Sequence, residues 1–205
     1  MPASRVDDCT GALLAGGRGA RLGGVPKGLL TLDGESIAAR TLQLFAGLFE
    51  ASLVVVASDP SPYRALGAAV VPDRLRGKGA PGGLHAALHA AATGWVFAAA
   101  CDMPFLRAEP VHLLAARRAG VAAVLVRWGG RLQPLHGLWS RACLPALEAL
   151  LAAGDPSLQE LARAVPVHVV EEAEWRQVDP EGRALENANT PGDVLRLGLG
   201  PLRST

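Results

Sequence analysis

The chain has 205 residues, half of them hydrophobic, which is enough for one sizeable core and near the lower limit for two independent domains. Its 20 Lys and Arg residues nearly balance 19 Asp and Glu residues, and a net charge of +1 argues against the strongly basic surface that nucleic acid binding requires. Because no segment holds about 18 consecutive apolar residues and the first residues contain no apolar signal core, we expect a cytoplasmic protein without a membrane span.

Short apolar strands alternate with helices through the first 126 residues. Each predicted strand is apolar throughout and ends near glycine, proline or aspartate, which is typical of strands buried on both faces. The sequence therefore predicts an α/β fold with a parallel sheet that helices cover on both sides. Strands are predicted at 10–15, 53–57, 68–71, 95–100 and 122–126, and helices at 36–49, from the glycines at 77–83 to about 92, and at 108–119.

The alternation weakens after residue 127. The Trp-Gly-Gly sequence at 128–130 indicates a turn between two strands, and Pro134 argues against an uninterrupted central strand over 133–139. Two amphipathic helices are predicted at 141–153 and 157–164. Near the end of the chain, Thr190 followed by Pro191 is typical of a helix start, with Thr as the N-cap and Pro at the first helical position.

The cysteines and one pair of histidines do not predict a zinc site. Cys9, Cys101 and Cys143 are widely separated and include no C-x-x-C spacing, so we expect reduced, mostly buried thiols. His85 and His89 stand four residues apart and would share one face of a helix, but no Glu follows the first His as the zinc protease motif requires. We interpret this pair as helix-surface residues.

The lysines are unusual in number and position. The basic residues are 18 arginines and only two lysines, Lys27 and Lys78, and both lysines lie in glycine-rich loops. An ammonium is a compact charge that fits among phosphate oxygens where a planar guanidinium does not. Retention of lysine at these two positions indicates phosphate contact, with an ordinary surface loop as the alternative.

The densest cluster of candidate residues lies at 14–27, where a strand end precedes five glycines, two arginines and a lysine. Glycines allow backbone N–H groups to approach an anion, while Arg18, Arg21 and Lys27 supply positive charge for a triphosphate. The segment is not a Walker loop, because no Gly-Lys is followed by Ser or Thr, and Leu22 occupies the last glycine position of the dinucleotide fingerprint. It predicts a phosphate-binding loop.

Two aspartates follow predicted strands. Asp102 comes directly after the strand at 95–100, and Asp73 follows the strand at 68–71. In an open parallel sheet, ligands bind beyond the carboxyl ends of the strands, so a carboxylate at Asp102 faces the same crevice as the glycine-rich loop. Asp73 is either a second acid at the metal, a nucleotide contact or a residue that forms a turn.

Four segments of the chain form a recognisable set: Leu14 to Gly34, Ala100-Cys-Asp-Met-Pro-Phe-Leu106, Gln133-Pro-Leu-His-Gly-Leu-Trp139 and Asn187-Ala-Asn-Thr-Pro-Gly-Asp193. Together they resemble the molybdenum cofactor guanylyltransferase family, which belongs to the nucleotide-sugar-pyrophosphorylase-like nucleotidyltransferases. The resemblance runs over nearly the whole chain. It implies a three-layer α/β/α Rossmann-like nucleotidyltransferase fold with a mostly parallel central sheet, built as a single domain over residues 1–205.

The resemblance implies an activity and a role for each matching residue. The reaction is transfer of GMP from GTP to the phosphate of molybdopterin, with Mg²⁺ as cofactor and pyrophosphate as the second product. Residues 1–126 are the nucleotide-binding part and residues 127–205 the acceptor-side part. The implied nucleotide-binding residues are Leu14, Ala15, Gly16, Gly17, Lys27, Asp73 and Asp102; the implied catalytic residues are Arg21, Lys27 and Asp102, with Asp102 as the metal ligand; Asn187 and Asn189 lie on the acceptor side.

Departures from the family pattern leave two alternatives open. Gly19 stands where Ser is common, Pro26 where Asp often precedes the lysine, and residues 79–83 read Gly-Ala-Pro-Gly-Gly in place of Gly-Pro-Leu-Ala-Gly. The alternatives are an enzyme of the same fold that uses CTP and a non-catalytic nucleotide-binding regulator. Whether the enzyme uses GTP or CTP, we expect small-molecule substrates, no nucleic acid or membrane partner, and at most transient contact with other cofactor-biosynthesis proteins.

Overall fold

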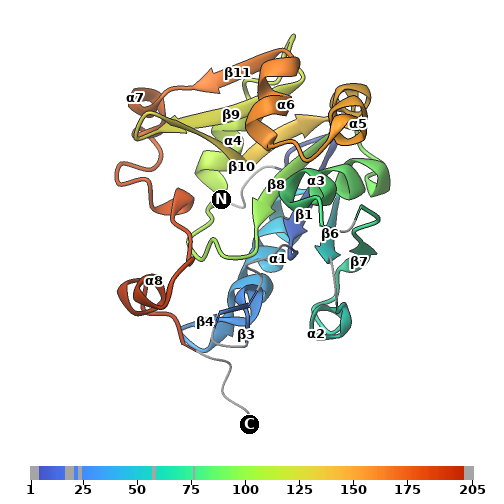
Figure 1. The fold of residues 1–205 in the computed structure, drawn as a ribbon. Coiled ribbons are helices and arrows are strands. Elements are labelled where there is room, and N and C mark those ends of the chain that lie inside the picture. Colours follow the sequence, from blue (N-terminus) through green and yellow to red (C-terminus); the bar gives the residue numbers. More distant parts are fainter. Residues whose placement is uncertain (1–4, 17–20, 23–24, 57–58, 76, 201–205) are drawn as a thin grey trace.

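A seven-stranded sheet runs through the part of the chain that the computed structural model describes, namely residues 5–16, 21–22, 25–56, 59–75 and 77–200 (Figure 1). Its strand order is β11-β9-β10-β8-β1-β6-β7, and all strands run parallel except β10. This arrangement confirms the predicted α/β class and the mostly parallel sheet. The strands are β1 (Cys9–Leu14), β6 (Ala51–Val56), β7 (Ala69–Pro72), β8 (Trp95–Ala100), β9 (Ala123–Trp128), β10 (Arg131–Ser140) and β11 (Val167–Val170).

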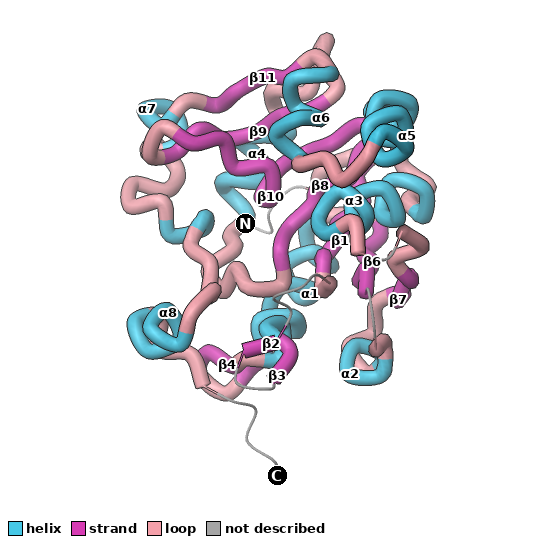
Figure 2. The backbone as a smooth tube through the Cα atoms, viewed as in Figure 1, coloured by secondary structure: helices cyan, strands magenta, loops and turns pink. Residues whose placement is uncertain are grey.

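Helices cover both faces of the sheet, as the tube view shows by colour (Figure 2). Successive residues of a strand point to opposite faces, so the apolar runs supply two separate cores. In β1, Leu13 packs into the core shared with α1 and α4, whereas Ala12 and Leu14 pack into the core shared with α3, α5 and α6. The helices are α1 (Ile37–Leu48), α2 (Ser61–Arg64), α3 (Gly79–Ala90), α4 (Ala108–Ala115), α5 (Leu144–Ala153), α6 (Leu158–Ala164), α7 (Glu172–Trp175) and α8 (Pro191–Arg196).

Glycine at position 11 allows α1 to pack closely on the middle of the sheet. A Cβ atom there would lie 2.5 Å from Phe45 and 2.6 Å from Phe49, far inside van der Waals contact. Phe45 and Phe49 form a ring cluster with Phe97 of β8, with ring centroids 5.3 to 5.8 Å apart. Aromatic packing of this kind fixes α1 against β1 and β8, the two strands that lead to the candidate site.

The antiparallel strand β10 is central but irregular. Its pairing with β9 shifts register between Gln133 and Leu138, and His136 within the shift has a φ of 69°. The shift accommodates Pro134, which cannot donate to a ladder, so the prediction that this strand is interrupted at Pro134 is confirmed. The irregular turn directs Leu135 toward the carboxyl edge of the sheet, where it lines a cavity described below.

His136 is a buried core residue. Its ring packs edge-on against Phe97 and Trp175, and its Nδ1 donates a hydrogen bond of 3.3 Å to the carbonyl oxygen of Ala184. Burial lowers the pKa of His136 from 6.5 to about 4, although the Ala184 carbonyl and the charge of Asp179 partly oppose this shift. The ring is therefore neutral in the folded state at neutral pH.

The lowered pKa of His136 predicts acid sensitivity. Below pH 6.5 the unfolded chain takes up a proton that the folded chain does not bind until about pH 4, so the folded state loses stability as the pH falls through this window. Between pH 7 and pH 4.5 this residue should contribute a loss of about 2 to 3 kcal/mol. In His136→Asn, whose side chain does not titrate and tolerates a positive φ, urea unfolding at the two pH values should show a smaller difference than the wild type shows. An equal difference in both proteins would contradict a buried neutral imidazole.

The C-terminal segment returns to the N-terminal part of the chain. Thr31 exchanges backbone hydrogen bonds of 2.7 and 2.9 Å with Gly200, and α8 lies near the short strand β4 (Thr31–Leu32; Figure 1). Leu30, Ile37 and Ala188 share a small buried cluster with Leu197 and Leu199. The short strands are β2 (Arg21–Leu22), β3 (Val25–Pro26), β4 (Thr31–Leu32) and β5 (Glu35–Ser36).

The prediction of reduced, buried cysteines agrees with the structure. Cys9, Cys101 and Cys143 are free and buried. Burial raises the pKa of each thiol to about 12, so the thiols remain protonated at neutral pH. Over the residues that the structure describes, every helix is too short or too polar to cross a membrane.

Candidate active site

The loops after four strands meet at one edge of the sheet. Leu14, the last residue of β1, lies opposite Val55 of β6 and Ala100 of β8, and Val56 lies opposite Pro72 of β7. The residues that follow these strands are therefore neighbours. The chain passes from β1 outward to β6 and β7 and then returns to β8 on the other side of β1, which makes the β1/β8 edge a topological switch point. Open α/β sheets bind their ligands at such points.

Three polar side chains converge at this edge. The Lys27 ammonium donates a hydrogen bond of 3.0 Å to Asp102 Oδ2 and one of 2.7 Å to Asn189 Oδ1. The side chains of Lys27 and Asp102 are only 10% and 13% exposed. A charged pair that is largely removed from water depends on such contacts, because an isolated buried charge is costly. The structure thus joins predicted residues that are 75 and 162 positions apart in the chain.

Close backbone packing holds Lys27 in place. Lys27 begins a short 3₁₀ turn, Lys27–Leu29, that Pro26 precedes, and its carbonyl accepts a hydrogen bond from the Leu30 N–H. A Cβ atom at Gly28 would lie 3.1 Å from Tyr63 Oη and 3.2 Å from Cys101 Cβ. The absence of a side chain at Gly28 therefore lets the lysine turn lie directly against the end of β8.

The C-terminal segment positions Asn189. The Ala188 N–H donates to the Asp102 carbonyl oxygen at 2.9 Å, which ties this segment to the end of β8. Next to it, Thr190 and Asp193 form a capping box at the start of α8, and Asp193 Oδ2 also accepts a hydrogen bond of 3.0 Å from the Asn189 N–H. This confirms the helix start predicted at Thr190. The cap fixes the backbone from which Asn189 reaches Lys27.

Asp73 lies at the same edge and is buried. Its N–H donates to the Val56 carbonyl, and its Oδ1 accepts a hydrogen bond of 2.9 Å from the Leu75 N–H. Burial raises the pKa of Asp73 above its usual value, while the Leu75 N–H and the charge of His85 act in the opposite direction. The hydrogen bond to Leu75 is typical of a turn, so the turn-forming interpretation of Asp73 is correct as far as local structure goes.

A cavity of about 260 Å³ brings these residues together. The N-terminal turn of α3 forms one wall, and its Gly83 packs against Leu14, whose side chain would lie 3.5 Å from an added Cβ. Two other cavities, of about 640 and 710 Å³, are lined by different residues from this cavity, and none of the predicted site residues lines either of them. The smaller cavity is therefore the candidate site. It is lined by Leu14, Gly16, Lys27, Val55, Asp73, Gly79, Ala80, Gly83, Ala100, Cys101, Asp102, Leu135 and Asn189.

Several predicted residues lie outside the cavity lining or outside the described residues. Gly17 and Arg18 belong to the undescribed residues, and Arg21 is placed only as part of the backbone of β2. Ala15 is buried and its N–H donates to the Val55 carbonyl at 2.8 Å, so it extends the edge of the sheet. Asn187 is partly buried, and its Oδ1 has no hydrogen-bond partner among the described residues.

Lys78 does not face the cavity. Its ammonium binds the Gly154 carbonyl at 2.8 Å and the Asp155 carboxylate at 2.6 Å, both in the loop between α5 and α6. In the structure it connects the start of α3 to that loop, and phosphate contact by Lys78 is not supported. Sequence reasoning also missed Leu135 as a lining residue, although it lies within the segment 133–139 that carried part of the resemblance.

Comparison with known proteins agrees with this geometry. Residues 11–174 match a family described as the MobA-like NTP transferase domain, a span that includes Lys27, Asp73 and Asp102. The chain is 36% identical to the molybdenum cofactor guanylyltransferase of Pseudomonas putida strain F1 over 93% of this chain and 97% of that protein. It is 33% identical to a probable molybdenum cofactor guanylyltransferase of Pelotomaculum thermopropionicum over 91% and 90%, respectively. The crystal structure of molybdopterin-guanine dinucleotide biosynthesis protein A from Archaeoglobus fulgidus superposes with a TM-score of 0.75 at 28% identity, covering 91% of this chain and 95% of that one.

Proposed function

Because this chain belongs to the MobA-like NTP transferase domain family, we propose that it transfers GMP from GTP to the phosphate of molybdopterin and releases pyrophosphate. The observation that carries the proposal is the Lys27, Asp102 and Asn189 cluster at the switch point of the sheet. A cation and a carboxylate held together in a cavity provide the two groups that bind a triphosphate and its metal ion.

The reaction needs no nucleophilic side chain. An oxygen of the acceptor phosphate forms a bond to the α-phosphorus of GTP, and the bond from that phosphorus to the oxygen bridging the α and β positions breaks. Pyrophosphate leaves with that bridging oxygen and the electron pair of the broken bond. Such transfers are accelerated mainly by positioning and by neutralising charge on the phosphate oxygens. Lys27 supplies one fixed positive charge, and Arg21 is proposed to supply a second.

The acidic residues fit a divalent metal ion. Mg²⁺ prefers oxygen ligands and is usually held by one or two carboxylates together with substrate phosphates. Asp102 and Asp73 both line the cavity and supply such oxygens. Bound there, Mg²⁺ would neutralise phosphate charge and stabilise the leaving pyrophosphate. Asp102 is the proposed ligand, and Lys27 compensates its charge when nucleotide and metal are absent.

We propose that different parts of the chain bind the nucleotide and the acceptor. The backbone at Leu14 to Gly16 would face the guanine, while Asn187 and Asn189 would lie on the acceptor side. Leu135 and Asn189 belong to residues 127–205 and line the same cavity as Leu14, which supports an acceptor-side role for that part of the chain. A cytoplasmic location and transient contact with other cofactor-biosynthesis proteins belong to the same proposal.

Substitution of Asp73 separates nucleotide binding from turn formation. Asp73→Asn keeps an oxygen acceptor for the Leu75 N–H but removes a buried negative charge whose pKa is raised, so the melting temperature at pH 7 should equal or exceed the wild-type value. If Asp73 contacts the bound nucleotide or its metal, the affinity for GTP with Mg²⁺ should fall roughly 10-fold, as loss of one charge-assisted hydrogen bond predicts. Calorimetric titration measures the affinity for GTP, and calorimetric melting measures the stability. Unchanged affinity would mean that Asp73 only forms the turn and does not contact the nucleotide or its metal ion.

Donor preference distinguishes GTP from CTP as the substrate. In calorimetric titrations with Mg²⁺ and without acceptor, we expect GTP to bind at least about 10-fold more tightly than CTP, because a site that hydrogen-bonds one base leaves its polar groups unpaired with another. Tighter binding of CTP would favour a cytidylyltransferase of the same fold. A non-catalytic regulator is disfavoured, because a carboxylate facing a triphosphate is costly unless a metal ion lies between them.

A further inference from the structure

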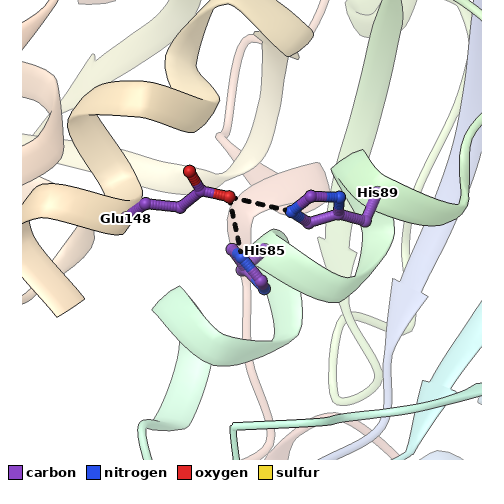
Figure 3. A group of neighbouring side chains, drawn as sticks. All are labelled: His85, His89 and Glu148. Atoms are coloured by element: carbon purple, nitrogen blue, oxygen red, sulfur yellow. Dashed lines mark hydrogen bonds and ion pairs between the residues drawn. The ribbon is translucent and has the colours of Figure 1, made fainter. Parts of the chain in front are cut away.

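Two histidines of α3 and a glutamate of α5 lie together at the protein surface, where these two helices are neighbours. His85 and His89 project from successive turns of α3, and Glu148 reaches them from α5 (Figure 3). Glu148 Oε1 lies 3.4 Å from His85 Nε2 and 3.0 Å from His89 Nε2. One oxygen atom thus faces two imidazole nitrogens, and these three atoms all lie within 4.8 Å of one another.

We propose that His85, His89 and Glu148 form a binding site for a divalent transition metal ion of the zinc class. A zinc ion with bonds of about 2.0 to 2.1 Å holds neighbouring tetrahedral ligand atoms about 3.3 Å apart. The two distances from the Glu148 oxygen to the histidine nitrogens bracket that separation. Two histidines and one carboxylate are also a ligand set found for zinc, with water in the fourth position.

Burial and charge at the cluster suit this ligand set. The His85 side chain is 15% exposed and so is held against the helix pair, while the side chains of His89 and Glu148 are about half exposed, which leaves room for an ion and water to enter. Zinc binds deprotonated ligands, and an exposed carboxyl group beside two imidazole rings supplies this chemistry at neutral pH.

The metal would bridge the wall of the nucleotide cavity to the helix behind it. The same helix α3 begins at Gly79, which lines the cavity, and Lys78 already connects that end of α3 to the α5–α6 loop. A metal ion at His85 and His89 would add a second connection further along α3. Because the ion would bind the folded arrangement, zinc should raise the melting temperature. This site uses none of the residues assigned to catalysis, so the inference does not depend on the proposed function.

Calorimetric titration of the full chain with Zn²⁺ tests the site. The wild type should bind one Zn²⁺ ion that excess Mg²⁺ does not displace, because imidazole ligands favour zinc over magnesium. His89→Ala and Glu148→Gln should each weaken this binding at least about 10-fold. Loss of a group that only hydrogen-bonds to a metal ligand already costs about this much, and these two residues are the proposed ligands themselves. Substitution of Co²⁺ gives a second readout, since a tetrahedral site should produce visible absorption that both variants lose.

Two control variants separate this site from other metal-binding groups. His168→Ala removes another imidazole outside the buried core, and Asp102→Asn removes the proposed magnesium ligand; both should retain the wild-type affinity for Zn²⁺ and the rise in melting temperature. Equal Zn²⁺ affinity in the wild type, His89→Ala and Glu148→Gln would overturn the proposal. Failure of the wild type to bind Zn²⁺ or Co²⁺ would overturn it as well and would leave the cluster as a hydrogen-bonded histidine pair.

Discussion

The Asp102→Asn variant should turn over at least about 100-fold more slowly than the wild type, because loss of a single preorganised electrostatic group has an effect of this size. Asn has nearly the same shape as Asp, and the Ala188 N–H bonds the backbone of residue 102 and not its side chain, so the contact that ties the C-terminal segment to the end of β8 should persist. What is lost is the negative charge proposed to hold the metal beside the phosphates. Pyrophosphate release at saturating GTP and molybdopterin measures the effect, and titration with Mg²⁺ should show a higher requirement for the metal.

Asp155 provides a matched control for Asp102. It also forms an ion pair with a lysine, Lys78, at 2.6 Å, but Asp155 lies in the loop between α5 and α6 and its side chain is exposed. Asp155→Asn should therefore leave turnover close to the wild-type value, since exposed ion pairs contribute little. If Asp102→Asn turned over as fast as Asp155→Asn, Asp102 would not be the metal ligand.

Replacement of Lys27 should be as damaging, and arginine should not restore activity. The Lys27 ammonium is buried between Asp102 and Asn189 at 3.0 and 2.7 Å, a space that fits a compact charge. A guanidinium is planar and larger, so Lys27→Arg keeps the charge but displaces it. We expect both Lys27→Met and Lys27→Arg to lose at least about 100-fold in turnover. Steady-state assays of both variants measure this, with circular dichroism to confirm folding.

A double substitution tests whether Lys27 and Asp102 act together. If both groups stabilise the same transition state, the Lys27→Met and Asp102→Asn double variant should be nearly as active as the slower single variant, because effects of residues that act as a unit are not additive. Lys78→Met is the matched control for the lysine and should retain turnover. Wild-type activity of Lys27→Arg would show that any cation suffices there and would contradict the structural argument for lysine.

Regular elements and their direction could be predicted from local pattern. The strand predicted at 95–100 matches β8 at both ends, because a continuous apolar run between polar turns defines a buried strand by itself. From that strand end, the position of Asp102 at the ligand-binding edge followed from the general behaviour of parallel sheets. The short strands β2 to β5 were not predicted, because two residues give no detectable periodicity, and β11 was not predicted, because His168 interrupts its short apolar run.

The long-range contacts of the site could not be predicted from spacing. Lys27 and Asn189 are 162 residues apart, and their contact depends on the return of the C-terminal segment to the end of β8. The spacing of His85 and His89 indicates one face of a helix, as α3 shows, but it cannot reveal Glu148, which comes from a different helix 59 residues beyond His89. The division into a nucleotide part and an acceptor part at residue 126 remains a prediction, as do the roles of the individual site residues.

Pyrophosphate release with molybdopterin as acceptor is the most direct test of the proposed reaction. The donor is GTP, CTP, ATP or UTP, each with Mg²⁺ and with the metal removed by chelation. We expect release with GTP alone, only when Mg²⁺ is present, and a product that contains guanosine monophosphate joined to the molybdopterin phosphate. Release with CTP in place of GTP would contradict the assigned base, and release with none of the four donors would contradict the assigned reaction.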